Sequence, residues 1–369
     1  MDVCELAIIG GGAIGLSLAY ELAVRGRKVA LFDRGELGRE ASWAGAGILP
    51  PAPTRGVLDP IDQLRRLAME LHPVLARRLA EETGIDTGFR ECGAIYAAFS
   101  VGERASLVGL HNLNQEQGIE SRLLSSDELA QIEPAINVNA IAGAIELPGE
   151  WQLRNPHHLR ALEAACRQRG VLLRPDEEVG SLESASSEGW LLRTPRGVTR
   201  AERVCVAAGA WSPRLLASLG VECSVFPIRG QMVLYRSARP LIRRIVNVGP
   251  RYLVPRDDGH LLVGSTEEEV GFDKSNTDKA IAELRGLAEA LIPDLKYEQV
   301  VRTWAGLRPA SFDSMPYMGE APGHPGLYLA SGHFRSGLYL SPAVARLMAD
   351  LICGETPPID LWPFRISRG

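Results

Sequence analysis

Residues 6–33 of this 369-residue chain read LAIIGGGAIGLSLAYELAVRGRKVALFD, and this stretch decides the fold. Residues 6–9 are a short apolar run, typical of a buried parallel strand. Gly10, Gly12 and Gly15 then follow the G-x-G-x-x-G spacing, which allows a tight turn, a close approach of backbone N–H groups to a pyrophosphate, and close helix packing. Apolar positions continue at helical spacing, and residues 28–32 read as a second strand. The order predicts a dinucleotide-binding βαβ unit.

The second strand ends at an acid, Asp33, which lies about 20 residues after the last glycine, where a carboxylate can bind an adenosine ribose. The motif binds the ADP half that FAD and NAD share, so it leaves both open. We expect the following residues to line this part of the site: Gly10, Gly12, Ala13, Ile14, Gly15, Asp33 and Arg34.

A second small-residue segment, EASWAGAGILP, occupies residues 40–50. Its alanines and glycines would let the backbone lie close against a flat ligand, and Ser42 can donate a hydrogen bond to a phosphate. A plain glycine-rich loop is the alternative interpretation. The cofactor residues expected here are Ser42, Ala46, Gly47 and Ile48.

Length and composition limit the classes of function. A chain of this size favours two domains. The net charge of −5 gives no overall attraction to nucleic acid or anionic lipid. Six cysteines without a CxxC pair predict free thiols in a reducing compartment. No leader, membrane span or metal-ligand spacing stands out, so we expect a cytoplasmic protein without a metal.

Periodicity predicts the remaining elements. Helices are expected over residues 61–83, over residues 155–169 with Asn155 as cap, and over residues 277–291 with Ser275 and Asp278 at capping-box spacing. Short strands fill much of residues 89–147 and 225–264, and Asp257-Asp258-Gly259-His260 is expected to form a hairpin turn between two of them. This interleaving predicts an α/β protein in which an antiparallel sheet is inserted into a nucleotide-binding domain.

Two stretches resemble the opening of the FAD-dependent amine and D-amino acid oxidase superfamily: GGGAIGLSLAYELAVRGRKVALFDRG and ASWAGAGIL. In that superfamily the second stretch runs beneath the flavin, which favours FAD over NAD. RVCVAAGAWS, residues 203–212, resembles the segment beside the adenine and ribitol, although alone it could be an ordinary βα turn.

The resemblance implies an FAD-binding Rossmann-like domain of the glutathione-reductase type with an inserted antiparallel-sheet substrate domain. We assign the first domain to residues 1–86, 147–218 and 304–369. We assign the second to residues 87–146 and 219–303.

The carboxy-terminal third narrows the resemblance. WAGLRPASFDSMPYMG, GLYLASGHFRSGLYLSPAVARLMADLI and RYLVPRDDGHLLVGSTEE are similar to glycine oxidases, deaminating enzymes that serve the thiazole branch of thiamine biosynthesis. By position, Arg308 would bind the substrate carboxylate, Tyr252 would hydrogen-bond it, and Arg335 would lie near the substrate. The further flavin contacts implied are Val179, Ala208, Gly209, Trp211, Gly332, His333, Phe334, Arg335, Ser336, Gly337 and Leu338.

The resemblance also implies the reaction. A hydride passes from the substrate Cα to FAD, oxygen accepts the electrons as hydrogen peroxide, and the imino acid hydrolyses to glyoxylate and ammonia or goes to thiazole synthesis. We name no general base. Ser341-Pro342 is expected to start a helix whose positive N-terminus, with Arg335, stabilises the reduced flavin. No cysteine lies in WAGLRP, so we expect non-covalent FAD.

Several alternatives remain open. The chain could be a D-amino acid or sarcosine dehydrogenase with an acceptor other than oxygen, an oxidative tRNA-modification domain, or a non-catalytic flavoprotein. The substrate could be glycine, sarcosine or a small D-amino acid such as D-alanine, and a homo-oligomer is possible. Glu267 stands where the family carries an apolar residue. It is expected to be exposed to solvent, or else to touch the substrate amine.

Overall fold

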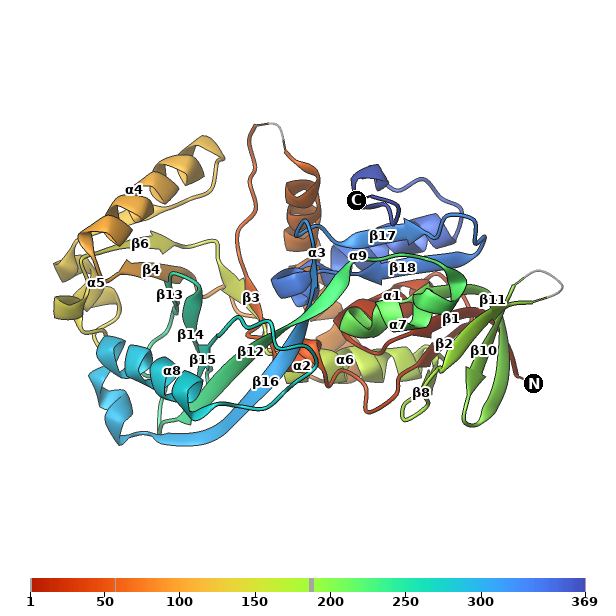
Figure 1. The fold of residues 1–369 in the computed structure, drawn as a ribbon. Coiled ribbons are helices and arrows are strands. Elements are labelled where there is room, and N and C mark those ends of the chain that lie inside the picture. The colour runs from red at the N-terminus through yellow and green to blue at the C-terminus, as the bar shows by residue number, and fades with distance from the viewer. Residues whose placement is uncertain (1, 57, 186–188, 369) are drawn as a thin grey trace.

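Two eight-stranded sheets form the framework of the computed structural model, which describes residues 2–56, 58–185 and 189–368. Figure 1 shows the sheets side by side, with β12 and β16 running through the middle of the molecule. The α/β class with an added antiparallel sheet is as the sequence predicted.

The first sheet has the order β17-β18-β11-β1-β2-β8, with a β9–β10 hairpin attached to β11. Its central strands β1, β2, β11 and β18 are parallel to their neighbours in this group. The strands span β1 Asp2–Ile9, β2 Val29–Phe32, β8 Leu172–Arg174, β9 Ser181–Ser184, β10 Trp190–Thr194, β11 Gly197–Val206, β17 Tyr317–Glu320 and β18 Leu327–Ser331.

Strand β1 shows why this sheet forms the core. Leu6 and Ile8 point to one face and join the cluster that includes the helices, whereas Ala7 and Ile9 point to the other face. All four are buried, which confirms the prediction of a central strand covered on both sides. The helices on the first face are α1 Ala13–Val24, α6 Asn155–Gln168 and α9 Gly337–Ile352, and α3 Pro60–Thr83 packs against α6 and α9 from outside.

The second sheet has the order β16-β12-β15-β14-β13-β4-β6-β5 and is antiparallel except between β13 and β4. Its strands span β4 Ala94–Ala98, β5 Arg122–Leu124, β6 Gly143–Leu147, β12 Val225–Arg236, β13 Ile245–Val248, β14 Arg251–Pro255, β15 His260–Gly264 and β16 Gln299–Ser311. The helices α5 Ser126–Ile132 and α8 Asp278–Leu291 pack on one face of this sheet, and α4 Val101–Glu116 lies against β4 and β6 on the opposite face (Figure 1). Strand β16 continues past residue 304, and the proposed domain boundaries stay a prediction.

Two predicted helix caps are wrong. Asn155 is the first residue of α6, and its amide donates to the carbonyl of Ser42 instead of capping the helix. Helix α8 is capped by Thr277, whose hydroxyl accepts from the Ala280 N–H, while Ser275 donates to Asp273. In both cases a tertiary or neighbouring partner competes successfully for the side chain.

Helix α9 begins at Gly337, four residues before the predicted start at Ser341. Pro342 lies inside it and cannot donate to the carbonyl of Leu338. The Ser341 hydroxyl donates to that carbonyl at 2.9 Å, so the missing backbone hydrogen bond is replaced. The pair Ser341-Pro342 is therefore compatible with a continuous helix.

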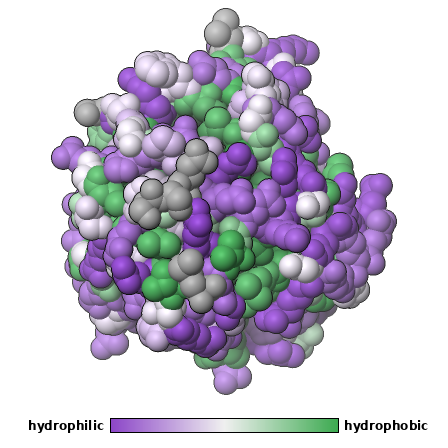
Figure 2. All heavy atoms as spheres, turned by 90° about the vertical axis from the view of Figure 1, so that its right-hand side faces the viewer, coloured by the Kyte–Doolittle hydropathy of each residue, from purple (hydrophilic) through white to green (hydrophobic). Residues whose placement is uncertain are grey.

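The outer surface at the end that carries β9 and β10 is mostly polar (Figure 2). Figure 2 shows hydrophilic side chains interspersed with small hydrophobic patches on this face. Such a mixture is ordinary for an exposed surface, because polar groups alone cannot cover a folded domain. No helix in the described ranges is long and apolar enough to cross a membrane.

Candidate active site

The predicted cofactor residues meet at one edge of the first sheet. The glycine turn follows β1, Asp33 follows β2, Ala208 to Trp211 follow β11, and residues 332–338 follow β18. Val179 lies beyond the end of β8 and is buried. Carboxyl ends of parallel strands share one edge, where ligands of open α/β sheets bind. The structure thus brings together segments that are more than 300 residues apart.

The glycine turn is closely packed. A side chain at Gly15 would overlap the carbonyl oxygen of Gly10, so helix α1 can start this near β1 only with glycine there. The Ala13 N–H donates to the Ser42 hydroxyl at 2.8 Å, which joins the turn to the second small-residue segment. The N-cap residue of α1, Gly12, has no side chain to cap the helix, so the N–H groups of the first turn other than that of Ala13 can bind a phosphate.

Asp33 supports the turn directly. Its two carboxylate oxygens accept from the N–H groups of Gly11 and Gly35, at 2.7 and 3.0 Å. Burial raises the pKa of the Asp33 carboxyl, and the two backbone donors oppose that rise. A carboxylate has further lone pairs, so ribose binding by Asp33 stays compatible with these contacts. Nearby, the Arg34 guanidinium lies 3.8 Å from the ring centre of Trp211.

The segment from Ser42 to Ile48 is held by its own carbonyl groups. It comprises α2 Ala41–Ala44 and β3 Ile48–Leu49, which pairs with β7 Trp151–Gln152. Four carbonyls accept from distant donors: Ser42 from the Asn155 amide, Ala44 from the Trp304 indole, Ala46 from Arg256, and Gly47 from the Leu153 N–H. The sequence did not predict these donors.

Arg256 is the most constrained of these donors. It donates to Ala46 at 2.7 Å and also to Gln152 and Leu153, at 2.6 and 3.1 Å. Burial lowers its pKa to about 10, so it remains cationic at neutral pH. The predicted hairpin turn at residues 257–260 is confirmed, and it places Arg256 at the end of β14. Arg256 therefore connects the second sheet to the segment that the resemblance places beneath a flavin.

A row of side chains crosses the second sheet on the side of Ala46 and Ile48. Directly paired positions on successive strands form it, in the order Tyr96, Asn247, Tyr252, Gly264, Met232 and Trp304. The buried Tyr252 hydroxyl lies 3.5 Å from the Met232 sulfur. Glu150 accepts from the Tyr96 hydroxyl at 2.6 Å and from the Asn247 amide at 2.9 Å. Of this row, the sequence predicted only Tyr252.

Arg308 lies on β16 and extends across β12. Its guanidinium donates to the Thr266 carbonyl at 3.0 Å and to the Ser265 hydroxyl at 2.5 Å. A side chain at Gly230 would overlap that guanidinium, so glycine leaves the space that Arg308 fills. In the described parts of the chain, no acidic side chain pairs with Arg308. Its charge is held by neutral oxygens and stays available to an anion.

Arg335 lies in a different electrostatic setting. It donates to Glu267 at 2.6 Å and to the Pro250 carbonyl at 3.1 Å. Both side chains of the ion pair are more than one third exposed. Glu267 is thus exposed, as expected, and has a partner that the sequence did not predict. Glu267 therefore compensates the charge of Arg335, and the role of Arg335 beside a flavin stays a prediction.

Comparison with known proteins decides the family. The family described as FAD dependent oxidoreductase matches residues 5–351. The chain belongs to this family. Glycine oxidase of Pseudomonas aeruginosa is 38% identical, over 98% of both chains. The crystal structure of glycine oxidase from Geobacillus kaustophilus is 36% identical, with a TM-score of 0.95 over the whole of both chains. A Nostoc protein, "Bifunctional protein ThiO/ThiG", is 32% identical over 99% of this chain and 55% of its own length.

The FAD dependence of the family agrees with the groups at the sheet edge. Buried polar atoms without a partner in the described residues include the His333 Nε2 and the Asn155 Oδ1. Burial lowers the pKa of His333 to about 3, so its ring is neutral. Helix α9 also starts without a side-chain cap. Open N–H groups at two helix starts and unsatisfied polar atoms nearby are what a bound dinucleotide would complete.

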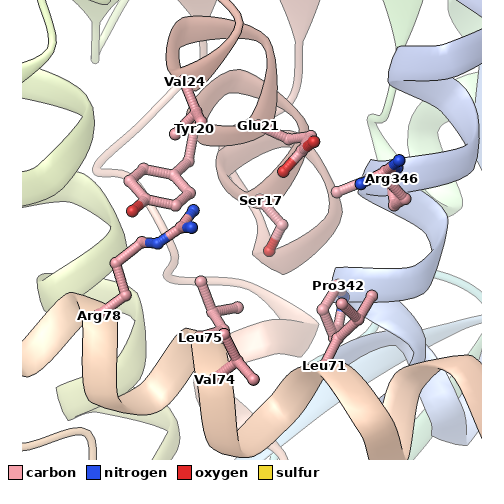
Figure 3. Close-up of a pocket in the computed structure, with 11 residues that line it drawn as sticks. Ser17, Tyr20, Glu21, Val24, Leu71, Val74, Leu75, Arg78, Pro342 and Arg346 are labelled. Carbon is pink, nitrogen blue, oxygen red and sulfur yellow. The ribbon is translucent and has the colours of Figure 1, made fainter.

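A separate pocket lies away from this edge. It has a volume of about 220 Å³ between α1, α3 and α9, and Figure 3 shows Ser17, Leu75 and Pro342 around it. None of the described residues that line it is a predicted site residue. The candidate active site therefore comprises the residues at the edge of the first sheet and the row on the second sheet, which Ala46 and Ile48 join.

Proposed function

We propose that this enzyme oxidises small amino acids, glycine among them, to imino acids and passes the electrons to oxygen. The observation that carries the proposal is the setting of Arg308. A guanidinium held only by neutral oxygens, with the Tyr252 hydroxyl on the neighbouring part of the same sheet, is suited to one carboxylate.

The chain's contribution is to hold and orient the substrate. Arg308 would bind the carboxylate through its planar fork, and Tyr252 would donate to the same group. The hydroxyl can do so because its partner, the Met232 sulfur, is a weak acceptor that a carboxylate would replace. Bound FAD would supply the acceptor for a hydride from the substrate Cα. Fixing that carbon in a productive geometry removes an entropic part of the barrier.

Exclusion of water supports the same role. Tyr252 and Met232 are buried, and the segment of Ala46 closes the space on the opposite side. The buried Glu150 is already engaged with Tyr96 and Asn247, so we assign it no proton transfer to substrate. The proposed mechanism therefore uses orientation and desolvation without a side-chain acid or base.

Further parts of the proposal rest on the relatives. The similarity to a protein named ThiO/ThiG supports delivery of the imino acid to thiazole formation in thiamine biosynthesis, or its hydrolysis to glyoxylate and ammonia. Sarcosine and D-alanine are proposed as additional substrates. We also propose non-covalent FAD, since Cys223 and Cys353, the cysteines nearest in sequence to WAGLRP, lie outside it.

The test is one spectroscopic experiment on the purified protein in air. The visible flavin band and hydrogen peroxide are recorded while glycine, sarcosine and D-alanine are added in turn. Peroxide formed with glycine is the expected result. Bleaching without peroxide would favour a dehydrogenase that lacks its acceptor. A flavin that no amino acid bleaches would contradict the proposal and turn the search to larger amines, tRNA included.

A further inference from the structure

One short loop connects the two arginines of the site. Ser265 and Thr266 accept from Arg308, and the next residue, Glu267, accepts from Arg335. Three consecutive residues therefore set the surroundings of both guanidinium groups. The loop leaves strand β15 directly after Gly264, which pairs with Tyr252 on β14.

The two guanidinium groups differ in how their charge is balanced. Arg308 has only neutral acceptors among the described residues, whereas Arg335 has a carboxylate at 2.6 Å. The other terminal nitrogen of Arg335 donates to Pro250, two residues before Tyr252. Both terminal nitrogens of Arg335 are thus engaged. Of these two guanidinium groups, only that of Arg308 keeps a charge that no acidic side chain of the described residues compensates.

The one available charge of this pair, on Arg308, favours amino acids that carry one carboxylate. A substrate with one carboxylate matches Arg308 and leaves the second pair undisturbed. A substrate with two carboxylates would have to compete with Glu267 for Arg335 and would then lie beside the negative charge of Glu267. In a partly desolvated site, repulsion between Glu267 and the second carboxylate weakens the binding of a dicarboxylate, whereas a ligand with one carboxylate does not meet this repulsion.

We propose that Glu267 is a specificity-determining residue: by pairing with Arg335 it makes the enzyme select small amines with one carboxylate and reject those with two. The inference rests on the proposed function and names its substrate class. Iminodiacetate and D-aspartate are the dicarboxylate amines that it excludes. Glycine, sarcosine and D-alanine carry one carboxylate each and remain accepted.

The test compares Glu267→Gln with Glu269→Gln. Both variants remove one negative charge from the same exposed segment, but only Glu267 pairs with Arg335. For each protein, kcat/KM is measured for glycine and for iminodiacetate. We expect the ratio of iminodiacetate to glycine to rise about tenfold in Glu267→Gln, mainly through a lower KM for iminodiacetate, and to stay unchanged in Glu269→Gln.

Binding of unreactive ligands gives a readout that does not depend on turnover. Dissociation constants of acetate and malonate are measured from the shift of the flavin spectrum. Malonate should bind about tenfold more tightly to Glu267→Gln than to the wild type, with acetate little changed. In the double variant Glu267→Gln/Arg335→Gln the gain should vanish, because the released guanidinium is gone.

Three results would overturn the inference: an unchanged malonate-to-acetate ratio in Glu267→Gln, an equal gain in Glu269→Gln, or a gain that survives removal of Arg335. Failure of the proposed function looks different. A wild-type protein that forms no peroxide with any of these amines would contradict that function, whereas the comparison of malonate with acetate would still decide the role of Glu267.

Discussion

Arg308 and Arg335 show how much a residue's neighbours decide its use. Arg308 precedes Pro309 and Arg335 lies two residues before Gly337, and the resemblance placed both arginines near the substrate. In the structure, one is held by a hydroxyl and a carbonyl and the other by an acid. Only the first keeps a charge that a substrate can use without breaking an ion pair.

Two replacements of Arg308 distinguish the contribution of its positive charge from that of its planar guanidinium group. We expect Arg308→Ala to raise the KM for glycine about 100-fold and Arg308→Lys about tenfold, since lysine keeps the charge but not the planar fork. Flavin content should be unchanged in both variants. Steady-state peroxide assays measure the effect, and equal KM values in wild type and Arg308→Ala would remove Arg308 from the carboxylate role.

Gly230 offers a test of the same contact from the other side. A methyl group in Gly230→Ala would displace the guanidinium of Arg308, which is the flexible end of a side chain, so the fold should tolerate it. We expect a KM for glycine about tenfold higher, with a loss of unfolding free energy near 1 kcal/mol or less. Gly286→Ala in α8, where the added methyl meets open space, should leave KM unchanged.

At the scale of elements, the segment from Ser42 to Ile48 is fixed by hydrogen bonds to its carbonyls. Its donors come from α6, from the strand that carries Trp304, and from the residue after β14. Its alanines and glycines offer few side-chain atoms, so their backbone carbonyls position them, while the Ser42 hydroxyl accepts from Ala13 and Trp43 packs against Trp304. Rigid support of this kind keeps a flat ligand at a constant distance from the second sheet.

Arg256→Met should loosen this support while keeping the apolar stem. We expect FAD to dissociate about tenfold more readily, because a buried carbonyl at Ala46 loses its charged donor. The measurement is the fluorescence of FAD released on dilution. Arg251→Met, on the same hairpin but paired with Glu283 at 3.5 Å, is the matched control and should bind FAD normally. Equal release from both variants would contradict the role of Arg256.

At the scale of the whole molecule, buried histidines make the fold sensitive to acid. Burial lowers the pKa of His72 to about 4, and burial with the neighbouring His72 lowers that of His158 to about 3. The folded protein therefore keeps these rings neutral while the unfolded chain binds protons below about pH 6.5. Stability is retained above that pH and is lost as the pH falls toward 4.

His158→Leu should reduce this acid sensitivity. Neither ring nitrogen has a partner among the described residues, so leucine removes no hydrogen bond seen there. Between pH 7 and 5, we expect the variant to lose about 2 kcal/mol less unfolding free energy than the wild type. Denaturant titrations at both pH values measure the difference. His324→Leu, at a partly exposed position, should keep the wild-type pH dependence.

The features that the sequence predicted depend on residues close together in the chain, whereas the features that it missed depend on residues far apart. The turn at Gly10, the helix ending at Gly84 and the hairpin before β15 depend on neighbouring residues, and all three are present. The row from Tyr96 to Trp304 depends on the register of strands about 200 residues apart, which no local pattern encodes. Likewise, no residue near Asn155 in the sequence indicates that its amide would donate to the carbonyl of Ser42 and would not cap helix α6.

The strand order also has a consequence for how the chain is made. β1 needs β11, and β11 needs β18, which ends at residue 331. During synthesis from the first residue onward, the nucleotide-binding half is completed only when nearly the entire polypeptide has been made, and β11 has no partner on the β18 side until then. Ribosome-arrested chains that stop before residue 327 should retain no flavin, whereas released full-length chains should. Flavin would thus report completion of the protein, and chaperones would have to shield the open edge of β11 until then.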